Sequence, residues 1–137
     1  MKLISKPIEA VLLENGALCA AGEDTSQIKP VCKLFTPWGG ATWLISEMDP
    51  ENPDILFGLC DLGLGFPEIG SVSLSELQEL RGPARLKVER DRFFEPSMTL
   101  IAYADAVRAA GSYRILSGGR IAWLMNSTAR PIRQASP

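Results

Sequence analysis

Two apolar segments joined by a short polar link place the strongest constraint on how this chain folds. In "ATWLISEM", an extended chain places Trp43 and Ile45 on one face and Leu44 and Met48 on the other. The segment "ILFGLC" repeats the pattern, and the intervening "DPENPD" is rich in turn residues and of hairpin length. Strands that are apolar on both faces are usually covered on both sides. We therefore expect these two strands at the centre of a small sheet.

The rest of the chain predicts helices and further strands around this pair. Three helices are expected, one from Ser5 to Asn15-Gly16, one from Ser73 to Gly82-Pro83, and one ending at Gly111. The segments "VCKLFTP" and "LKVERDRFF" are strand-like, and the mixed charges of the second indicate an exposed edge. The predicted fold class is α+β, a small, mainly antiparallel sheet with about three helices in a single domain.

Two of the helices carry specific local signals. Ser73 and Glu76 form a capping box, with Val72 and Leu77 in the flanking hydrophobic-staple positions. The third helix is predicted to bury the face that carries Leu100, Tyr103, Ala104 and Val107. The first helix is predicted to bury Ile8, Val11 and Leu12.

A glycine-rich segment, "FGLCDLGLGFPEIG", separates the second central strand from the capped helix. Gly63, Gly65 and Pro67 interrupt the strand pattern with residues that allow unusual dihedrals or lack a ladder N–H. A dinucleotide-binding loop would need a third glycine at a fixed spacing and a helix starting at once, and this segment has neither. Asp61 and Glu68 on either side would also repel a phosphate. We interpret the segment as a structural turn.

The composition excludes several catalytic classes. The chain contains no histidine, which removes Ser-His and Cys-His mechanisms and most zinc hydrolase sites. Its cysteines, at positions 19, 32 and 60, are odd in number and widely spaced, so we expect buried free thiols rather than disulfides or a metal site. No cofactor and no metal ion are predicted.

Six residues are the predicted partner-binding positions. Asp49, Glu51 and Asp54 crowd the "DPENPD" link, which lacks the spacing and central glycine of an EF-hand and is better explained as a solvated turn. Trp38 stands beside two glycines and is the exception among nearby aromatic residues, most of which the strand pattern places in the core. The full set of predicted contact residues is Trp38, Asp49, Glu51, Asp54, Asp61 and Glu68.

Charge divides the chain into two regions. Residues 1–112 contain ten basic and sixteen acidic residues, whereas residues 113–137 contain four arginines and no acid. We therefore predict a compact domain at residues 1–112 and a basic C-terminal extension at residues 113–137. An acidic body favours a basic protein surface over phosphate, so direct binding of nucleic acid is not expected.

The apolar segments are too short to cross a bilayer, and Pro7 and Glu9 interrupt the only stretch that could act as a signal peptide. We expect a cytoplasmic protein with no membrane contact. A length of 137 residues suits one domain with one core.

Several runs of the sequence resemble a known family. These are "KLFTPWGGATWLISEMDPENPDILFGLCDLGLGFPEIGSVSLSELQELRGP", "VERDRFF" and "AYADAVRAAG". The chain is similar, over roughly Ile8 to Gly111, to small domain-of-unknown-function proteins encoded on conjugative plasmids and integrative mobile elements of proteobacteria. The resemblance implies a compact domain and a mobile-element setting, with no established reaction. Residues 112–137, with their apolar "IAWLM", depart from the family pattern.

Two classes of function are consistent with these observations. The first is a non-enzymatic accessory protein that binds a host or mobile-element protein complex, as in counter-defence against CRISPR or restriction systems. The alternative is a DNA-associated accessory factor of plasmid transfer or maintenance, or a carboxylate-dependent enzyme for which Asp61 and Glu68 are the first candidates.

Overall fold

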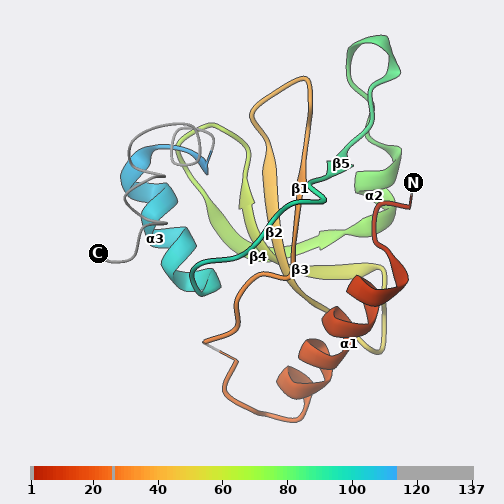
Figure 1. The fold of residues 1–137 in the computed structure, drawn as a ribbon, viewed down its shortest axis with the longest axis vertical. Helices are drawn as coiled ribbons and strands as arrows, with labels where there is room; N and C mark the ends of the chain where they lie inside the picture. Colours follow the sequence, from red (N-terminus) through yellow and green to blue (C-terminus); the bar gives the residue numbers. More distant parts are fainter. Residues whose placement is uncertain (1, 26, 114–137) are drawn as a thin grey trace.

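A computed structural model describes residues 2–25 and 27–113, which form a five-stranded antiparallel sheet flanked by helices (Figure 1). The strand order is β4-β3-β2-β1-β5. The predicted α+β class is confirmed. The strands are β1 (Cys32–Phe35), β2 (Thr42–Met48), β3 (Ile55–Asp61), β4 (Glu68–Ser73) and β5 (Glu89–Arg90), and the α-helices of the described residues are α1 (Lys6–Ala20), α2 (Leu74–Glu79) and α3 (Leu100–Ala110), with a 3-10 turn at Pro83–Arg85.

The central hairpin is formed by β2 and β3, as predicted. Its register runs from Thr42 opposite Asp61 to Met48 opposite Leu56, with a β-bulge between Ile45 and Glu47. The extra residue of a bulge reverses the alternation of side chains beyond it. Met48 therefore lies on the same face as Ile45, and its prediction for the opposite face is wrong.

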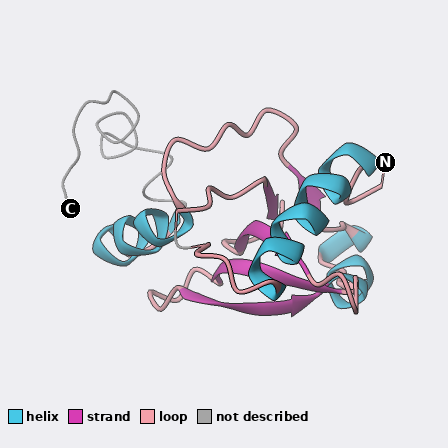
Figure 2. Ribbon diagram, turned by 90° about the horizontal axis from the view of Figure 1, so that it is seen from below, coloured by secondary structure: helices cyan, strands magenta, loops and turns pink. Residues whose placement is uncertain are grey.

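Each face of the sheet has its own hydrophobic core. On one face, α1 contributes Leu12 and α2 contributes Leu77 to a cluster that includes Ile45 and Leu56. On the other face, side chains of α3 pack on Leu44 and Leu59. Figure 2 shows α1 and α3 as separate helices. The expectation that the central strands are covered on both sides is confirmed.

Helix α1 continues past Gly16, where the sequence predicted its end. Gly16 is buried, and a Cβ atom there would overlap the main-chain oxygen of Met48. Asn15 donates a side-chain hydrogen bond to the Ser46 oxygen at 2.9 Å. A glycine within a helix costs about 1 kcal/mol relative to alanine, but here it allows the helix to lie directly against β2. Val11, predicted to be buried, is 42% exposed.

The local signals of the other two helices are confirmed. The Ser73 hydroxyl accepts a hydrogen bond from the Glu76 N–H at 3.3 Å and starts α2. The Thr99 hydroxyl starts α3 in the same way, and Gly111 ends it with a φ of 96°. All four residues predicted for the buried face of α3 are buried. α2 ends at Glu79, three residues before Gly82-Pro83.

Residues 81–87, "RGPARLK", form a projection that we call the basic arm. An isolated bridge pairs Arg81 with Lys87 at its base, and Ala84 and Arg85 both adopt positive φ, at 56° and 62°. Only Glu89 and Arg90 of the predicted strand "LKVERDRFF" pair in the sheet, and they lie at its edge, as expected.

Tyr113, predicted as the first residue of the extension, packs with the compact domain instead. It is 8% exposed and contacts the cluster that contains Leu59, Tyr103 and Val107. Residues 114–137, which hold the arginines of the predicted extension, lie outside the described residues. Among the described helices, none combines the length and the apolar character needed to cross a membrane.

Candidate functional site

The loop between β3 and β4 presents large apolar side chains to solvent. Leu62 is 54% exposed, Leu64 71% and Phe66 82%. We call residues 62–67 the hairpin tip; it lies beside α3 at the upper left of Figure 1. Apolar side chains exposed together in this way mark interaction sites more often than side chains exposed singly.

The backbone of the hairpin tip is held in one conformation by its own residues. Gly63 and Gly65 adopt φ values of 80° and 87°, which other residues adopt only at a cost. The Asp61 carboxylate accepts a hydrogen bond from the Gly63 N–H at 2.9 Å. The interpretation of this segment as a turn defined by backbone geometry is consistent with these dihedrals.

Two neighbouring elements support the hairpin tip from outside. A Cβ atom on Gly63 would lie 3.2 Å from the Gly40 oxygen, so the loop between β1 and β2 packs directly against it. From α3, the Arg108 guanidinium donates a hydrogen bond to the oxygen of Pro67, which is buried, at 3.4 Å. The apolar side chains are therefore displayed from a supported turn.

Asp61 is buried beneath the hairpin tip, with 1% of its surface exposed. Its second carboxylate oxygen accepts a hydrogen bond from the backbone N–H of Tyr113 at 2.6 Å. Both oxygens are thus engaged with main-chain donors, and Asp61 joins the end of β3 to the chain that follows α3. Among the six predicted contact residues it is the one that is fully buried.

Glu68 is close to Asp61 in the hairpin but does not pair with it. It is exposed and lies opposite Cys60 in the register of β3 and β4. Around the hairpin tip, Asp105 and Arg108 of α3 form an exposed ion pair at 3.5 Å, and Ile69 of β4 is 37% exposed. The tip is therefore an apolar surface whose rim carries Glu68 and the Asp105–Arg108 ion pair.

The three acidic residues of the link between β2 and β3 lie at the opposite end of β3 from the hairpin tip. Asp49 accepts a hydrogen bond from the Glu51 N–H at 2.9 Å, which closes the turn. Asp54 accepts from the Ser73 hydroxyl at 2.7 Å and from the Ser75 N–H at 2.9 Å, and these bonds lower the pKa of its carboxyl. Across the described residues of the chain, no three His, Cys, Asp or Glu side chains group as metal ligands would.

Trp38 supports the basic arm. Its side chain is half-buried at the edge of the α1 face of the sheet, and a Cβ atom on Gly82 would overlap its ring. The contact explains why a glycine stands at position 82. Trp38, which the sequence singled out as an exception to the core placement of its aromatic neighbours, thus exposes only a portion of its ring.

The cysteines differ in their surroundings, and none is in a disulfide. Cys32 is buried, and burial raises the pKa of its thiol to about 12. Cys60 is half-buried and its pKa is also raised by burial, whereas Cys19 is exposed. The prediction of buried thiols therefore holds for Cys32, in some measure for Cys60, and not for Cys19.

The most exposed apolar residues are absent from the predicted contact set. Leu64 and Phe66 alternate with Gly63 and Gly65, and these glycines predict a turn. Because turns lie at the surface, this alternation was the signal that the two apolar side chains are exposed. Phe93, at 85% exposure, stands within a run of charged residues that argues against burial.

Comparison with known proteins identifies a family. Residues 3–114 match the model of DUF2958, described as a protein of unknown function, so the chain belongs to that family. No curated protein and no solved structure matches the chain.

Proposed function

We propose that this member of the DUF2958 family is a non-enzymatic binding protein that inserts its hairpin tip into an apolar cleft of a protein complex. The observation that supports this proposal is the exposure of Leu64 and Phe66, at 71% and 82%, on a turn held by Asp61 and Arg108. A folded chain gains nothing in stability from leaving such side chains in water, whereas a partner does gain by covering them.

The expected gain is large enough to drive association. Complete burial of a leucine or phenylalanine side chain contributes about 1.5 to 3 kcal/mol. Leu64 and Phe66 together thus supply a large share of a micromolar interaction, which needs about 8 kcal/mol in total. Because the turn is already ordered, binding loses little conformational entropy there.

The rim of the hairpin tip defines the chemistry of the partner. Glu68 is exposed beside the apolar side chains, whereas Asp105 is already paired with Arg108, so the proposed cleft is apolar and has a basic group opposite Glu68. β4 is one of the two outer strands of the sheet, and it begins directly after the tip. A strand of the partner paired with β4 would extend the interface.

We assign the partner to a host or mobile-element complex in the cytoplasm, with counter-defence as the biological role. The support for this setting is the resemblance described above to proteins of conjugative plasmids and integrative elements. Occlusion of a CRISPR or restriction complex requires a small, stable protein with one strong contact surface, which is consistent with the hairpin tip.

The experiment compares the full chain with the double variant Leu64→Ser/Phe66→Ser in the cell of origin. Cross-linking and affinity purification should recover a specific complex with the original protein, and the variant should lose it. The thermal midpoint should stay unchanged, because neither side chain lies in a core. Leu18→Ser is the matched control, since Leu18 is 45% exposed on α1, outside the hairpin tip.

Two results would contradict the proposal. The complex could survive the double variant and disappear with the control, or the double variant could convert a dimer into a monomer in sedimentation experiments. The first result would place the contact elsewhere, and the second would make the hairpin tip a contact between two copies of this chain.

A further inference from the structure

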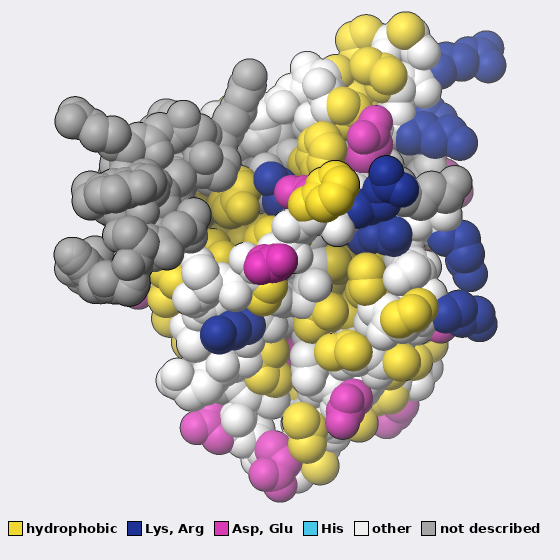
Figure 3. Space-filling view, in the orientation of Figure 1, with side chains coloured by type: hydrophobic (Ala, Val, Ile, Leu, Met, Phe, Trp, Pro, Cys, Tyr) yellow, Lys and Arg dark blue, Asp and Glu magenta, His cyan; other side chains and the backbone are white. Residues whose placement is uncertain are grey.

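Basic and acidic residues occupy different regions of the folded molecule. Residues 2–8 and 80–93 together contain seven basic and two acidic residues, whereas the remainder of residues 1–113 contains three basic and fourteen acidic residues. Figure 3 shows most of the visible Lys and Arg side chains along one side of the molecule. The body therefore has a positively charged surface although its net charge is negative.

We call this surface the basic face and define it by basic side chains of the arm, of β5 and the turn that follows it, and of the N-terminal segment. Arg85 and Lys87 are exposed on the arm. Arg81, also exposed, lies at its base and donates to the backbone oxygens of Gln78 at 2.7 Å and Leu80 at 3.0 Å. The Arg90 guanidinium joins the arm's neighbour β5 to the N-terminal segment by donating to the oxygens of Lys2 at 3.0 Å and Leu3 at 2.7 Å. The basic face consists of Lys2, Arg81, Arg85, Lys87, Arg90 and Arg92.

Phe93 stands on this face with its ring in solvent, 85% exposed. Asp91 sets its position by accepting a hydrogen bond from the Phe93 N–H at 2.9 Å. The Asp91 carboxylate also pairs with Lys33 of β1 at 3.6 Å, so its negative charge is matched by a base outside the basic face. The turn therefore displays an aromatic ring directly beside Arg92.

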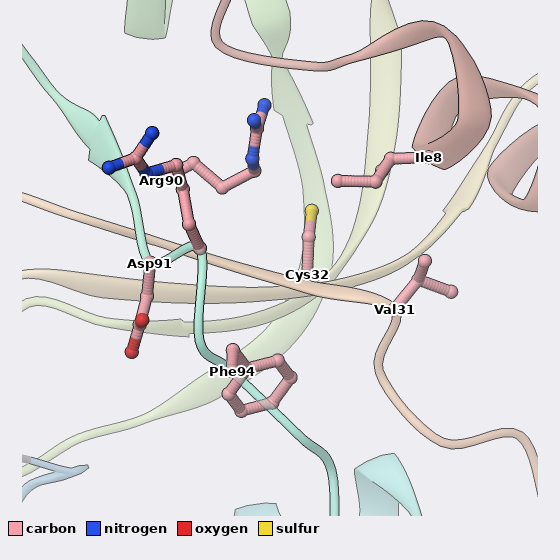
Figure 4. Close-up of a pocket in the computed structure, with 7 residues that line it drawn as sticks. Ile8, Val31, Cys32, Arg90, Asp91 and Phe94 are labelled. Atoms are coloured by element: carbon pink, nitrogen blue, oxygen red, sulfur yellow. The ribbon is translucent and has the colours of Figure 1, made fainter.

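A pocket of about 340 Å³ opens beside this turn (Figure 4). Ile8, Val31 and Cys32 line it together with Arg90, Arg92 and Phe94. In Figure 4 the carboxylate of Asp91 points away from Cys32. The basic face is thus followed by a recess that is lined by both apolar and charged side chains and has the size that small ring systems occupy.

We propose that the basic face binds single-stranded nucleic acid, with the phosphates on its Lys and Arg side chains and one base stacked on Phe93. Proteins that bind single strands combine basic grooves with aromatic rings, and stacking needs a base whose face is not covered by neighbours in a duplex. The acidic remainder of the body repels a duplex long enough to extend beyond the basic face. This proposal is independent of the protein contact at the hairpin tip.

The test measures fluorescence anisotropy of a labelled single strand of about 12 nucleotides with the full chain. We expect Phe93→Ala to weaken binding by about ten-fold, the loss typical of one stacked base. The double variant Arg85→Ala/Arg92→Ala should weaken binding and reduce the slope of log K against log salt by roughly 1.4, about 0.7 for each lost phosphate contact. A duplex of the same length should bind more weakly than the single strand.

Two controls keep these outcomes distinct. Lys29→Ala removes an exposed basic side chain from the segment between α1 and β1, outside the basic face, and should leave the affinity unchanged. The second control replaces the four arginines of residues 114–137 with glutamine, and the loss caused by Phe93→Ala should persist in that background.

Three results would overturn the proposal. The first is an affinity that Phe93→Ala leaves unchanged. The second is binding that disappears when the four arginines of residues 114–137 are replaced. The third is preferential binding of a duplex or of a poly-glutamate peptide, which would make the basic face a site for duplexes or for acidic proteins.

Discussion

Replacement of Asp61 by asparagine should destabilise the whole domain although it changes no solvent-exposed group. Asp61 is 1% exposed and accepts hydrogen bonds from Gly63 at 2.9 Å and from Tyr113 at 2.6 Å. Asparagine has nearly the same shape, but one of its two terminal atoms is an NH₂ group. One of the two backbone N–H donors would therefore face another donor.

The magnitude follows from the two bonds. A hydrogen bond to a charged acceptor contributes about 1.5 to 3 kcal/mol, and a buried donor without a partner costs about 1 to 3 kcal/mol. Asparagine needs no burial of charge, which offsets some of this loss. We expect Asp61→Asn to lower the free energy of unfolding by about 2 to 4 kcal/mol.

Urea denaturation of the purified full chain measures this change, with Asp105→Asn as the control. Asp105 is exposed, and its pair with Arg108 is worth at most about 1 kcal/mol. Amide hydrogen exchange adds a local readout, because the N–H groups of Gly63 and Tyr113 should lose protection first. A loss below about 0.5 kcal/mol with unchanged exchange at both amides would refute the assigned role of Asp61.

Two further predictions concern the core. Gly58 and Gly70 lie opposite each other on β3 and β4, but a Cβ atom on Gly58 would overlap the Leu44 oxygen, whereas one on Gly70 meets no atom within 4 Å. Gly58→Ala should therefore cost about 1 to 3 kcal/mol and Gly70→Ala almost nothing in the same denaturation assay, and equal effects would contradict the close packing of β2 on β3. Burial raises the pKa of Cys32 from 9.0 to about 12, so the unfolded chain loses this proton first as the pH rises. The contribution of the Cys32 thiol to stability is fully present below about pH 9 and is lost above it, by up to about 1.4 kcal/mol per pH unit. Cys32→Ala should make the free energy of unfolding fall less steeply with pH in this range. An unchanged slope would contradict the burial assigned to Cys32.

The elements of the fold that sequence predicts well are those determined by neighbours in the chain. The apolar alternation around Ile45 and in "ILFGLC" identified the central hairpin, and the Ser73 cap and the Gly111 stop identified two helix ends. In each case the residues that decide the structure are within about one turn or one strand of each other.

The wrong predictions concern features that depend on contacts between residues far apart in the chain. Gly16 was predicted to end a helix because glycine favours that position, but its role is to let α1 touch Met48, which is far from it along the chain. The side of the sheet on which Met48 lies depends on a bulge that its apolar pattern does not signal. Both features are decided by tertiary contact, which overrides local propensity.

The candidate sites were harder to predict because they depend on exposure and on the spatial sorting of charge. Asp61 and Glu68 are similar in sequence context, yet one is buried by Tyr113, 52 residues away, and the other is exposed. The net charge of residues 1–112 argued against nucleic acid, but a sum over a sequence does not report how the folded chain separates its charges.

The hairpin tip and the basic face are supported by the same element, the loop between β1 and β2. Gly40 of this loop packs against Gly63 in the tip, and Trp38 packs against Gly82 at the base of the arm. Figure 1 places the tip beside α3 and the arm on the side of the N-terminus, so the two surfaces diverge from the same end of the sheet. Because a single short loop contacts both, their relative position is fixed by packing rather than by a linker. A protein held at the tip and a strand held at the basic face would therefore meet this molecule from different sides, and neither would have to displace the other.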